Sequence, residues 1–519
     1  MNRKGVAILP LAGALILFLF PAQIRAGEGA AENPVSHDIP SAAEPGSPSP
    51  DVLSVTIEQA VLMALENNRA VRVERLSPSI TRTFEDQELA TFDPVFSAGA
   101  TAFGQRDEDR RGLEGDGRGG EAGAALVKKF ETGATVSAGA MAGLDTGDGL
   151  PDQYAARLGV DLTQPILKGR GRAVNLASLG QARLDSLLSE YEFRGFAESL
   201  VAQVEATYWD LVLARKRVAI VEESLALAVQ QSDETRHRIR VGNLAETEIA
   251  AAEAEKALRR EALINARSQV ESLRVRMLRL IRPQDLSTLA VREVTTGSEP
   301  TVDRPAPGPL ADHVATALAM RPDVNQARLL IQRGDLEIVK TRNGLLPRMD
   351  LFVSLGKTGY ADSFGGSVGD LTGQGYDISA GVTFERPLGN RDARARRERA
   401  LLTREQRQEA LANVRDLACQ DVELAYIEVG RARLLVDATA ATLRFQEEKL
   451  RAETAKFRVG KSTGLLVAQA QRDLLASRVA EVEAVTTFLK ARTSLFLLEG
   501  SLLTRRGLSA PGEAPQPYP

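Results

Sequence analysis

The sequence contains very few of the residues that build most catalytic and metal sites. Its 519 residues include one cysteine, Cys419, which excludes an internal disulfide and leaves no cysteine near the amino terminus to carry a lipid. The three histidines, His37, His237 and His313, are scattered, so with a single cysteine they offer no metal cluster and no paired nucleophile. The sequence therefore predicts neither an enzyme nor a protein with a cofactor or a metal.

Aromatic residues are scarce as well, at 5% of the chain, whereas charged residues make up 26%. This balance is typical of a protein that is rich in long helices and coiled coils. The net charge of −4 supplies no basic surface for the neutralisation of phosphates, which excludes nucleic acid as a partner.

The amino terminus has the order of a secretory signal peptide, which we assign to residues 1–26. Arg3 and Lys4 precede an apolar run from Val6 to Phe20, and the small residue Ala26 closes the segment. The run is shorter than the ~20 residues that a spanning helix needs. No other apolar stretch approaches that length. We therefore expect that the exported chain, if it crosses a membrane, crosses it as strands.

Two further segments, 27–50 and 507–519, are rich in proline and small residues. This composition predicts a disordered linker and a disordered tail.

The remainder of the chain is an internal repeat. Tyr208 to Val218 matches Tyr426 to Val436, 218 residues later, and Ile239 to Asn243 matches Phe457 to Lys461 at the same offset. Each copy reads as a helix, strands, and a long helical hairpin. In the long helices apolar residues recur every seven positions, the spacing of a coiled-coil seam: Val204, Leu211, Val218 and Leu225, and again Val422, Val429, Val436 and Leu443.

These patterns give two repeats with the same order of elements. The first repeat, 51–300, has strands at about 92–166 and a helical hairpin at 173–282. The second, 301–506, has strands at about 347–388 and a hairpin at 390–500.

The offset between the copies changes in the strand region. Ala64 to Val71 resembles Ala317 to Val324 at an offset of 253, whereas Tyr154 to Leu167 pairs with Tyr376 to Gly389 at 222, so the first copy carries 31 extra residues. Apolar residues alternate with small or polar ones on both sides of Glu131-Thr132-Gly133, which predicts a hairpin. This hairpin has two interpretations. It adds two strands to the membrane sheet, which gives six strands per chain and a periplasmic turn, or it stands outside the membrane above four strands; we favour the first.

The strand segments alternate in polarity and are separated by long polar loops, as in outer-membrane barrels, although a soluble sheet with one wet face would alternate too. Four strands cannot close a membrane barrel, and open edges in hydrocarbon leave backbone groups unpaired. We therefore expect copies to combine: three copies give twelve strands, or eighteen with the hairpin.

Two copies of strand-proline-strand, each followed by long helices that meet at Val-Gly turns, resemble the TolC-like outer-membrane efflux proteins over roughly Val55 to Gly500. The resemblance implies an α+β membrane protein: a homotrimeric outer-membrane β-barrel continued by a periplasmic α-helical coiled-coil barrel, with two repeats per chain. It implies an exit duct of a tripartite efflux pump or a type I secretion system. Its partners would be a periplasmic adaptor and an inner-membrane pump or secretion ATPase.

The resemblance also implies roles for the turns of the two helical hairpins, where the adaptor docks. The matching positions are Val241, Gly242, Asn243 and Leu244, and Val459, Gly460, Lys461 and Ser462. Asn243 and Lys461 replace the apolar or small residues often found after the glycine. A purely structural role would also explain the two glycines, because glycine lets the chain reverse its direction.

Beyond the tips the family narrows its tunnel, often with aspartates. The matching positions here are Leu466 and Gln469, with Glu248 in the first copy, so a ring of carboxylates is not expected. An aperture closed by Leu466 and hydrogen bonds, or a plain packing role for Leu466, fits these residues. The competing function is a periplasmic coiled-coil adaptor or scaffold without a pore, for which two matched sets of alternating strands would have no use.

Overall fold

The computed structural model describes residues 52–108, 114–147, 153–242, 245–281, 293–300, 307–459 and 461–509. The segments assigned to the signal peptide and the linker lie outside these residues, as do residues 510–519 of the predicted tail. The described residues belong to one structural unit.

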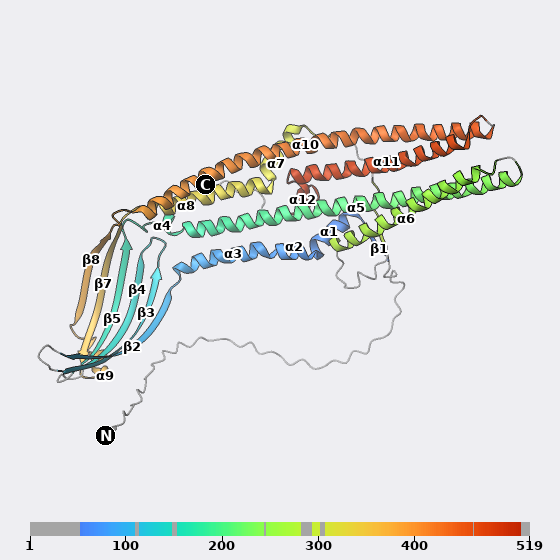
Figure 1. Cartoon of the computed structure of the whole chain (residues 1–519). Coiled ribbons are helices and arrows are strands. Elements are labelled where there is room, and N and C mark those ends of the chain that lie inside the picture. Colours follow the sequence, from blue (N-terminus) through green and yellow to red (C-terminus); the bar gives the residue numbers. More distant parts are fainter. Residues whose placement is uncertain are drawn as a thin grey trace, which may run out of the picture. The chain divides into compact units, whose positions relative to one another are not determined.

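The unit combines two long helical hairpins with one antiparallel sheet (Figure 1). The first half contains β1 (Val52–Val55), α1 (Ile57–Asn67), α2 (Arg69–Glu74), α3 (Leu76–Leu89), the 3-10 turn η1 (Ala90–Phe92), β2 (Val95–Glu108), β3 (Glu114–Lys129), β4 (Thr135–Gly147), β5 (Gln153–Pro165), α4 (Arg172–Asn175), α5 (Ala177–Arg240) and α6 (Glu248–Ile281). The second half contains β6 (Glu293–Thr296), α7 (Leu310–Met320), α8 (Pro322–Gly344), β7 (Arg348–Ala361), α9 (Phe364–Asp370), β8 (Tyr376–Glu385), α10 (Arg391–Arg458), α11 (Gly464–Leu498) and α12 (Leu502–Arg505).

The six-stranded sheet has the order β2-β3-β4-β5-β7-β8, and every neighbouring pair is antiparallel. The extra hairpin of the first copy, β3–β4, is therefore inside the sheet, between β2 and β5. Six strands of the chain therefore lie in one sheet, as the alternation favoured, and the placement of all six in the membrane stays a prediction.

The long helices lead from the sheet to the hairpin turns. α5 packs along α6, α10 along α11, and α5 also contacts α11. Near the sheet, four helices lie side by side in the order α3-α5-α8-α10. The strands lie at one end of these helices and the turns α5–α6 and α10–α11 at the other (Figure 1). Among the described residues, no helix has the length and apolar character to cross a membrane.

The core lies in the middle of the helices, where α5 meets α1, α6, α11 and α12. Its fully buried side chains include those predicted for the helical seam, Val204, Leu211 and Val422. Tyr208 adds a polar tie, because its hydroxyl donates to the Val55 carbonyl at 3.2 Å and accepts from the Ser298 amide at 2.9 Å. This tie anchors the small parallel β1–β6 pair, which the sequence patterns did not predict.

Two local signals set the ends of helices. Thr56 begins α1 with a capping box: its hydroxyl accepts from the Gln59 amide at 3.3 Å, and the Gln59 side chain accepts from the Thr56 amide at 2.9 Å. α11 ends at Leu498, and Gly500, just beyond its cap residue Glu499, has a φ of +66° in the left-handed region that favours glycine.

Candidate functional site

The sheet has one apolar face, here called the apolar face, which the protomer leaves largely uncovered. Side chains directly opposite each other on neighbouring strands point to the same side, so the register gives the members of each row. One apolar row crosses all six strands: Phe96, Leu126, Ala138, Val160, Leu355 and Ile378. Phe96 is 70% exposed and Ile378 65%. An uncovered apolar surface of this kind is suited to lipid.

The opposite face, here called the polar face, is the more hydrophilic of the two. One of its rows begins with Val95 and Val127 on β2 and β3 and continues with Ser137, Asp161, Ser354 and Ser379 on the other four strands. Arg157 of the same face forms an ion pair with Asp377 at 2.6 Å. Asp377 also accepts from the Thr358 hydroxyl at 3.1 Å. The face therefore carries charged groups that a hydrocarbon environment would not tolerate but a water-filled lumen would.

At the first hairpin turn, called tip 1, the end of α5 is closed by backbone hydrogen bonds. The Val241 amide donates to the His237 carbonyl at 3.1 Å, and the Gly242 amide to the Ile239 carbonyl at 3.0 Å. Gly242 has a φ of +75° with open space where a Cβ would stand, so its backbone conformation, not crowding, favours glycine there. The predicted tip residues Asn243 and Leu244 lie outside the described residues.

At the second turn, called tip 2, side chains tie the turn back to α10. The Ser462 hydroxyl donates to Glu453 at 2.7 Å, and Lys456 pairs with the same carboxylate at 2.7 Å. The Lys456 bond, followed by the Ser462 bond, holds the pKa of Glu453 below its usual range. The Lys461 amide donates to the Lys456 carbonyl at 2.8 Å, and Val459 is exposed. The predicted residue Gly460 lies outside the described residues.

The two tips touch each other through a contact that the sequence reading missed. The Arg238 guanidinium of α5 lies 5.5 Å from the centre of the Phe457 ring of α10, which is a cation–π contact. The 218-residue repeat shows that the tips are equivalent, but it contains nothing about which side chains of one tip reach the other. Only the packing of the hairpins reveals this pair.

The predicted constriction residues Glu248, Leu466 and Gln469 are all exposed in the protomer. Glu248 opens α6, and the Leu466 amide donates to Thr463, the N-cap of α11, at 3.4 Å. No hydrogen bond or ion pair within the described part of the chain joins any two of these three side chains. Their assignment to an aperture stays a prediction.

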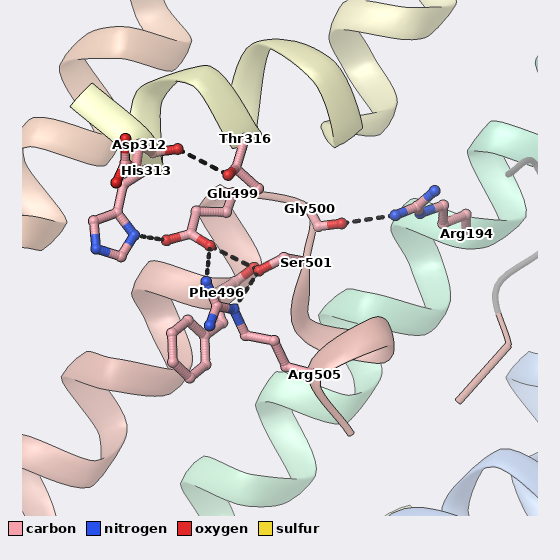
Figure 2. A network of polar contacts seen from close by, with 9 residues as sticks. All are labelled: Arg194, Asp312, His313, Thr316, Phe496, Glu499, Gly500, Ser501 and Arg505. Atoms are coloured by element: carbon pink, nitrogen blue, oxygen red, sulfur yellow. Dashed lines mark hydrogen bonds and ion pairs between the residues drawn. The ribbon is translucent and has the colours of Figure 1, made fainter. Parts of the chain in front are cut away.

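A buried polar network, here called the junction, joins the end of α11 to α5 and α7 (Figure 2). Glu499, fully buried, accepts from His313 Nδ1, from the Ser501 hydroxyl at 2.8 Å and from Arg505 at 3.1 Å. Arg194 of α5 donates to the Gly500 carbonyl at 2.7 Å. Charged groups this deeply buried are stable only when their hydrogen bonds are made, so the junction fixes the two halves of the chain to each other.

Arg194 also contacts Glu198, one turn further along α5, at 3.3 Å. Burial raises the pKa of Glu198 to about 7, although the guanidinium of Arg194 opposes the shift. The sequence shows the four-residue spacing of this pair but not its burial, and the burial is what perturbs the carboxyl.

A sheet with one lipid-compatible and one hydrophilic face, continued by helices that end in two equivalent turns, defines the class of outer-membrane channel subunits. The model of the outer membrane efflux protein family matches residues 314–501. A curated relative, the outer membrane efflux protein BepC of Brucella suis biovar 1 (strain 1330), is 24% identical over 356 residues, which cover 66% of this chain and 72% of BepC.

Solved structures show the same fold. The CmeC outer membrane channel of Campylobacter jejuni matches with a TM-score of 0.66 at 14% identity, over 90% of this chain and 94% of CmeC. The MtrE outer membrane channel of Neisseria gonorrhoeae, in its open state, matches with a TM-score of 0.59 at 20% identity, over 86% of this chain and 89% of MtrE. Residues 314–501 thus match the family of outer membrane efflux proteins, and the chain shares the fold of solved outer-membrane channels over most of its length.

Proposed function

We propose that the chain is one subunit of a homotrimeric exit duct, through which an inner-membrane pump or a secretion ATPase drives its substrates across the periplasm and the outer membrane. The observation that carries this proposal is the sheet: it has one apolar and one more hydrophilic face, and within the described part of the chain neither of its edges is paired. A curved sheet of this kind forms a pore only when further copies close it.

The two edges of the protomer fit each other. β2 runs away from the helices and β8 runs back toward them, so β8 of one copy can pair in antiparallel fashion with β2 of the next. The helices follow the same lateral order, since α3 leads into β2 and β8 leads into α10. One head-to-tail interface therefore continues from strands to helices, and such an interface forms a ring when the rotation closes.

The edge helices carry exposed apolar side chains along this interface. On α3 these are Leu76, Ile80 and Phe84, and on α10 they are Leu417, Leu424, Ile427 and Leu434. Their spacing of three, four or seven residues keeps each set on one side of its helix. Burial against the next copy would remove this surface from water, and the number of three copies is what the family resemblance implies.

The oligomeric state tests closure of the ring. We expect the mature protein in mild detergent to have the mass of a trimer by light scattering with correction for bound detergent. A monomeric mass under these conditions would contradict the duct, because a lone sheet cannot form a pore.

The tips are the proposed docking sites of a periplasmic adaptor. They are the parts of the hairpins that lie farthest from the sheet, and tip 1 exposes Val241 as tip 2 exposes Val459. Near them we place the aperture, formed by Glu248, Leu466 and Gln469. In this proposal the contact of Arg238 with Phe457 holds the two tips of one protomer together.

Substitution at the tips tests docking. Proline has a φ near −65°, so Gly242→Pro cannot keep the φ of +75° and should distort tip 1; Gly460→Pro is the equivalent change at tip 2. Both variants should reach the outer membrane as trimers and lose efflux, measured as accumulation of a pump substrate in cells. Gly430→Ala, in the middle of α10 with open space around it, is the control that should keep efflux. Full transport by both proline variants would remove the tip assignment.

The alternative, a periplasmic adaptor or scaffold without a pore, gives no role to the uncovered apolar face. A soluble protein rarely exposes an apolar patch that crosses a whole sheet.

A further inference from the structure

We propose that the β3–β4 hairpin widens the membrane pore, so that the trimer closes an eighteen-stranded barrel whose circumference equals that of its helical tunnel. The proposal rests on the trimeric duct proposed above. Its consequence concerns cargo: the membrane segment would impose no smaller size limit than the tunnel, and bulky solutes that pass the helices would leave without a second constriction.

The hairpin is a full member of the sheet. β3 pairs with β2 from Val95 to Glu108, and β4 pairs with β5 from Thr135 to Asp145. β2 and β5 are not neighbours, since both strands of the hairpin lie between them. An external hairpin would instead leave β2 paired with β5 and would share no rows with them.

The hairpin also continues both faces at the same level as the other strands. Its Leu126 and Ala138 belong to the apolar row that runs from Phe96 to Ile378. Lys128 is the charged residue of the hairpin on this face near the turn, where its ammonium lies 5.6 Å from the centre of the Phe130 ring. A lysine at this end of the strand can extend to the membrane surface, so it does not oppose burial of the face in lipid.

The turn of the hairpin is seated on the chain that leads into the helices. The Gly171 amide donates to the Thr132 carbonyl at 3.0 Å, and Glu131 pairs with Arg172 at 2.7 Å. Gly133 has a φ of +95°, and a Cβ there would lie 2.3 Å from the Gly169 carbonyl oxygen. A fit this close places the turn at the helical end of the sheet and fixes the position of the hairpin along the strand direction.

Strand and helix spacings give matching circumferences. Eighteen strands about 4.8 Å apart and tilted by about 40° span roughly 110 Å around the barrel. Twelve helices, four from each protomer near the sheet, span roughly 95–120 Å at separations of about 8–10 Å. Twelve strands at the same tilt would span only about 75 Å, so the barrel would be narrower than the tunnel by roughly one third.

Deletion of residues 114–147 removes the two strands and their turn. It leaves β2 joined to β5 through the remaining loop, with the same direction for every strand, and makes the first repeat resemble the second, in which β7 and β8 are adjacent. The deleted chain is the matched control for pore width.

The first measurement is the strand count of the full-length trimer by electron cryomicroscopy in detergent. Eighteen strands are expected. Twelve strands with three hairpins outside the barrel would overturn the proposal while leaving the duct intact, whereas failure to form a trimer would contradict the duct itself.

The second measurement is access to the lumen. In a Cys419→Ser background, Thr383→Cys places a thiol on the polar face and Val382→Cys places one on the apolar face of the same strand. Maleimides on polyethylene glycols of increasing size are added to intact cells. We expect Thr383→Cys to react with polymers about one and a half times wider in the full-length protein than in the deleted chain, and Val382→Cys to be protected by lipid. The same size limit in both chains would overturn the proposal.

Discussion

Replacement of Gly500 by alanine would test how firmly the second helical hairpin is held at the junction. Gly500 has a φ of +66°, and a Cβ there would lie 2.7 Å from the Arg321 Cα and 2.9 Å from the Met320 carbonyl oxygen. Both are backbone atoms of the connection between α7 and α8, so neither can turn aside as the end of a flexible side chain would. The Gly500 carbonyl also accepts from Arg194, so a shift of the turn would disturb that bond as well.

The expected loss has two parts. A non-glycine residue in the left-handed region destabilises by about 1–2 kcal/mol. Forcing an extra methyl group into packed structure adds about 1–3 kcal/mol. We therefore expect Gly500→Ala to lower the free energy of unfolding by roughly 2–5 kcal/mol.

Two other glycines separate these parts. Gly507 has a φ of +69° but open space around it, so Gly507→Ala should show only the conformational part, about 1–2 kcal/mol. Gly430 lies inside α10 with open space, so Gly430→Ala should stabilise by about 0.5–1 kcal/mol.

Thermal unfolding in detergent, followed by circular dichroism at a fixed heating rate, would rank the three variants. From highest to lowest, the expected order of the unfolding midpoints is Gly430→Ala, wild type, Gly507→Ala and Gly500→Ala. If Gly500→Ala unfolded at the same temperature as Gly507→Ala, the close contact at the junction would not destabilise the variant, and the reasoning would fail.

Two further predictions concern a titrating group and the orientation of the sheet. Because the pKa of Glu198 is raised from 4.5 to about 7, the folded protein binds a proton more tightly than the unfolded chain between these values, so this group makes stability fall as pH rises from about 4.5 to 7. Glu198→Gln should flatten that part of the dependence of the unfolding midpoint on pH, and an unchanged slope would show that another group titrates. Thr132→Cys, in a Cys419→Ser background, should resist an impermeant thiol reagent on intact cells and react after the outer membrane is permeabilised. Ser363→Cys, at the other end of the sheet, should react at once, and labelling of Thr132→Cys with protection of Ser363→Cys on intact cells would reverse the proposed orientation.

The sequence alone determined the features that depend on periodicity. A seven-residue spacing of apolar side chains predicts a coiled-coil seam wherever it occurs, and Val204, Leu211 and Val422 are fully buried as that spacing requires. Alternation along the strands predicted two faces of opposite polarity, since successive side chains on a strand point to opposite sides. It also favoured a hairpin around Thr132, because the same alternation appears on both sides of a short turn.

Only the tertiary structure decided which segments lie beside each other. Alternation cannot tell a hairpin inside a sheet from one above it, because both have the same local pattern; the pairing of β2 with β3 and of β4 with β5 settles this point. The same holds for the contact of Arg238 with Phe457 and for the burial of Glu499. These depend on residues more than 180 positions apart, and no local pattern records how two distant helices are rotated toward each other.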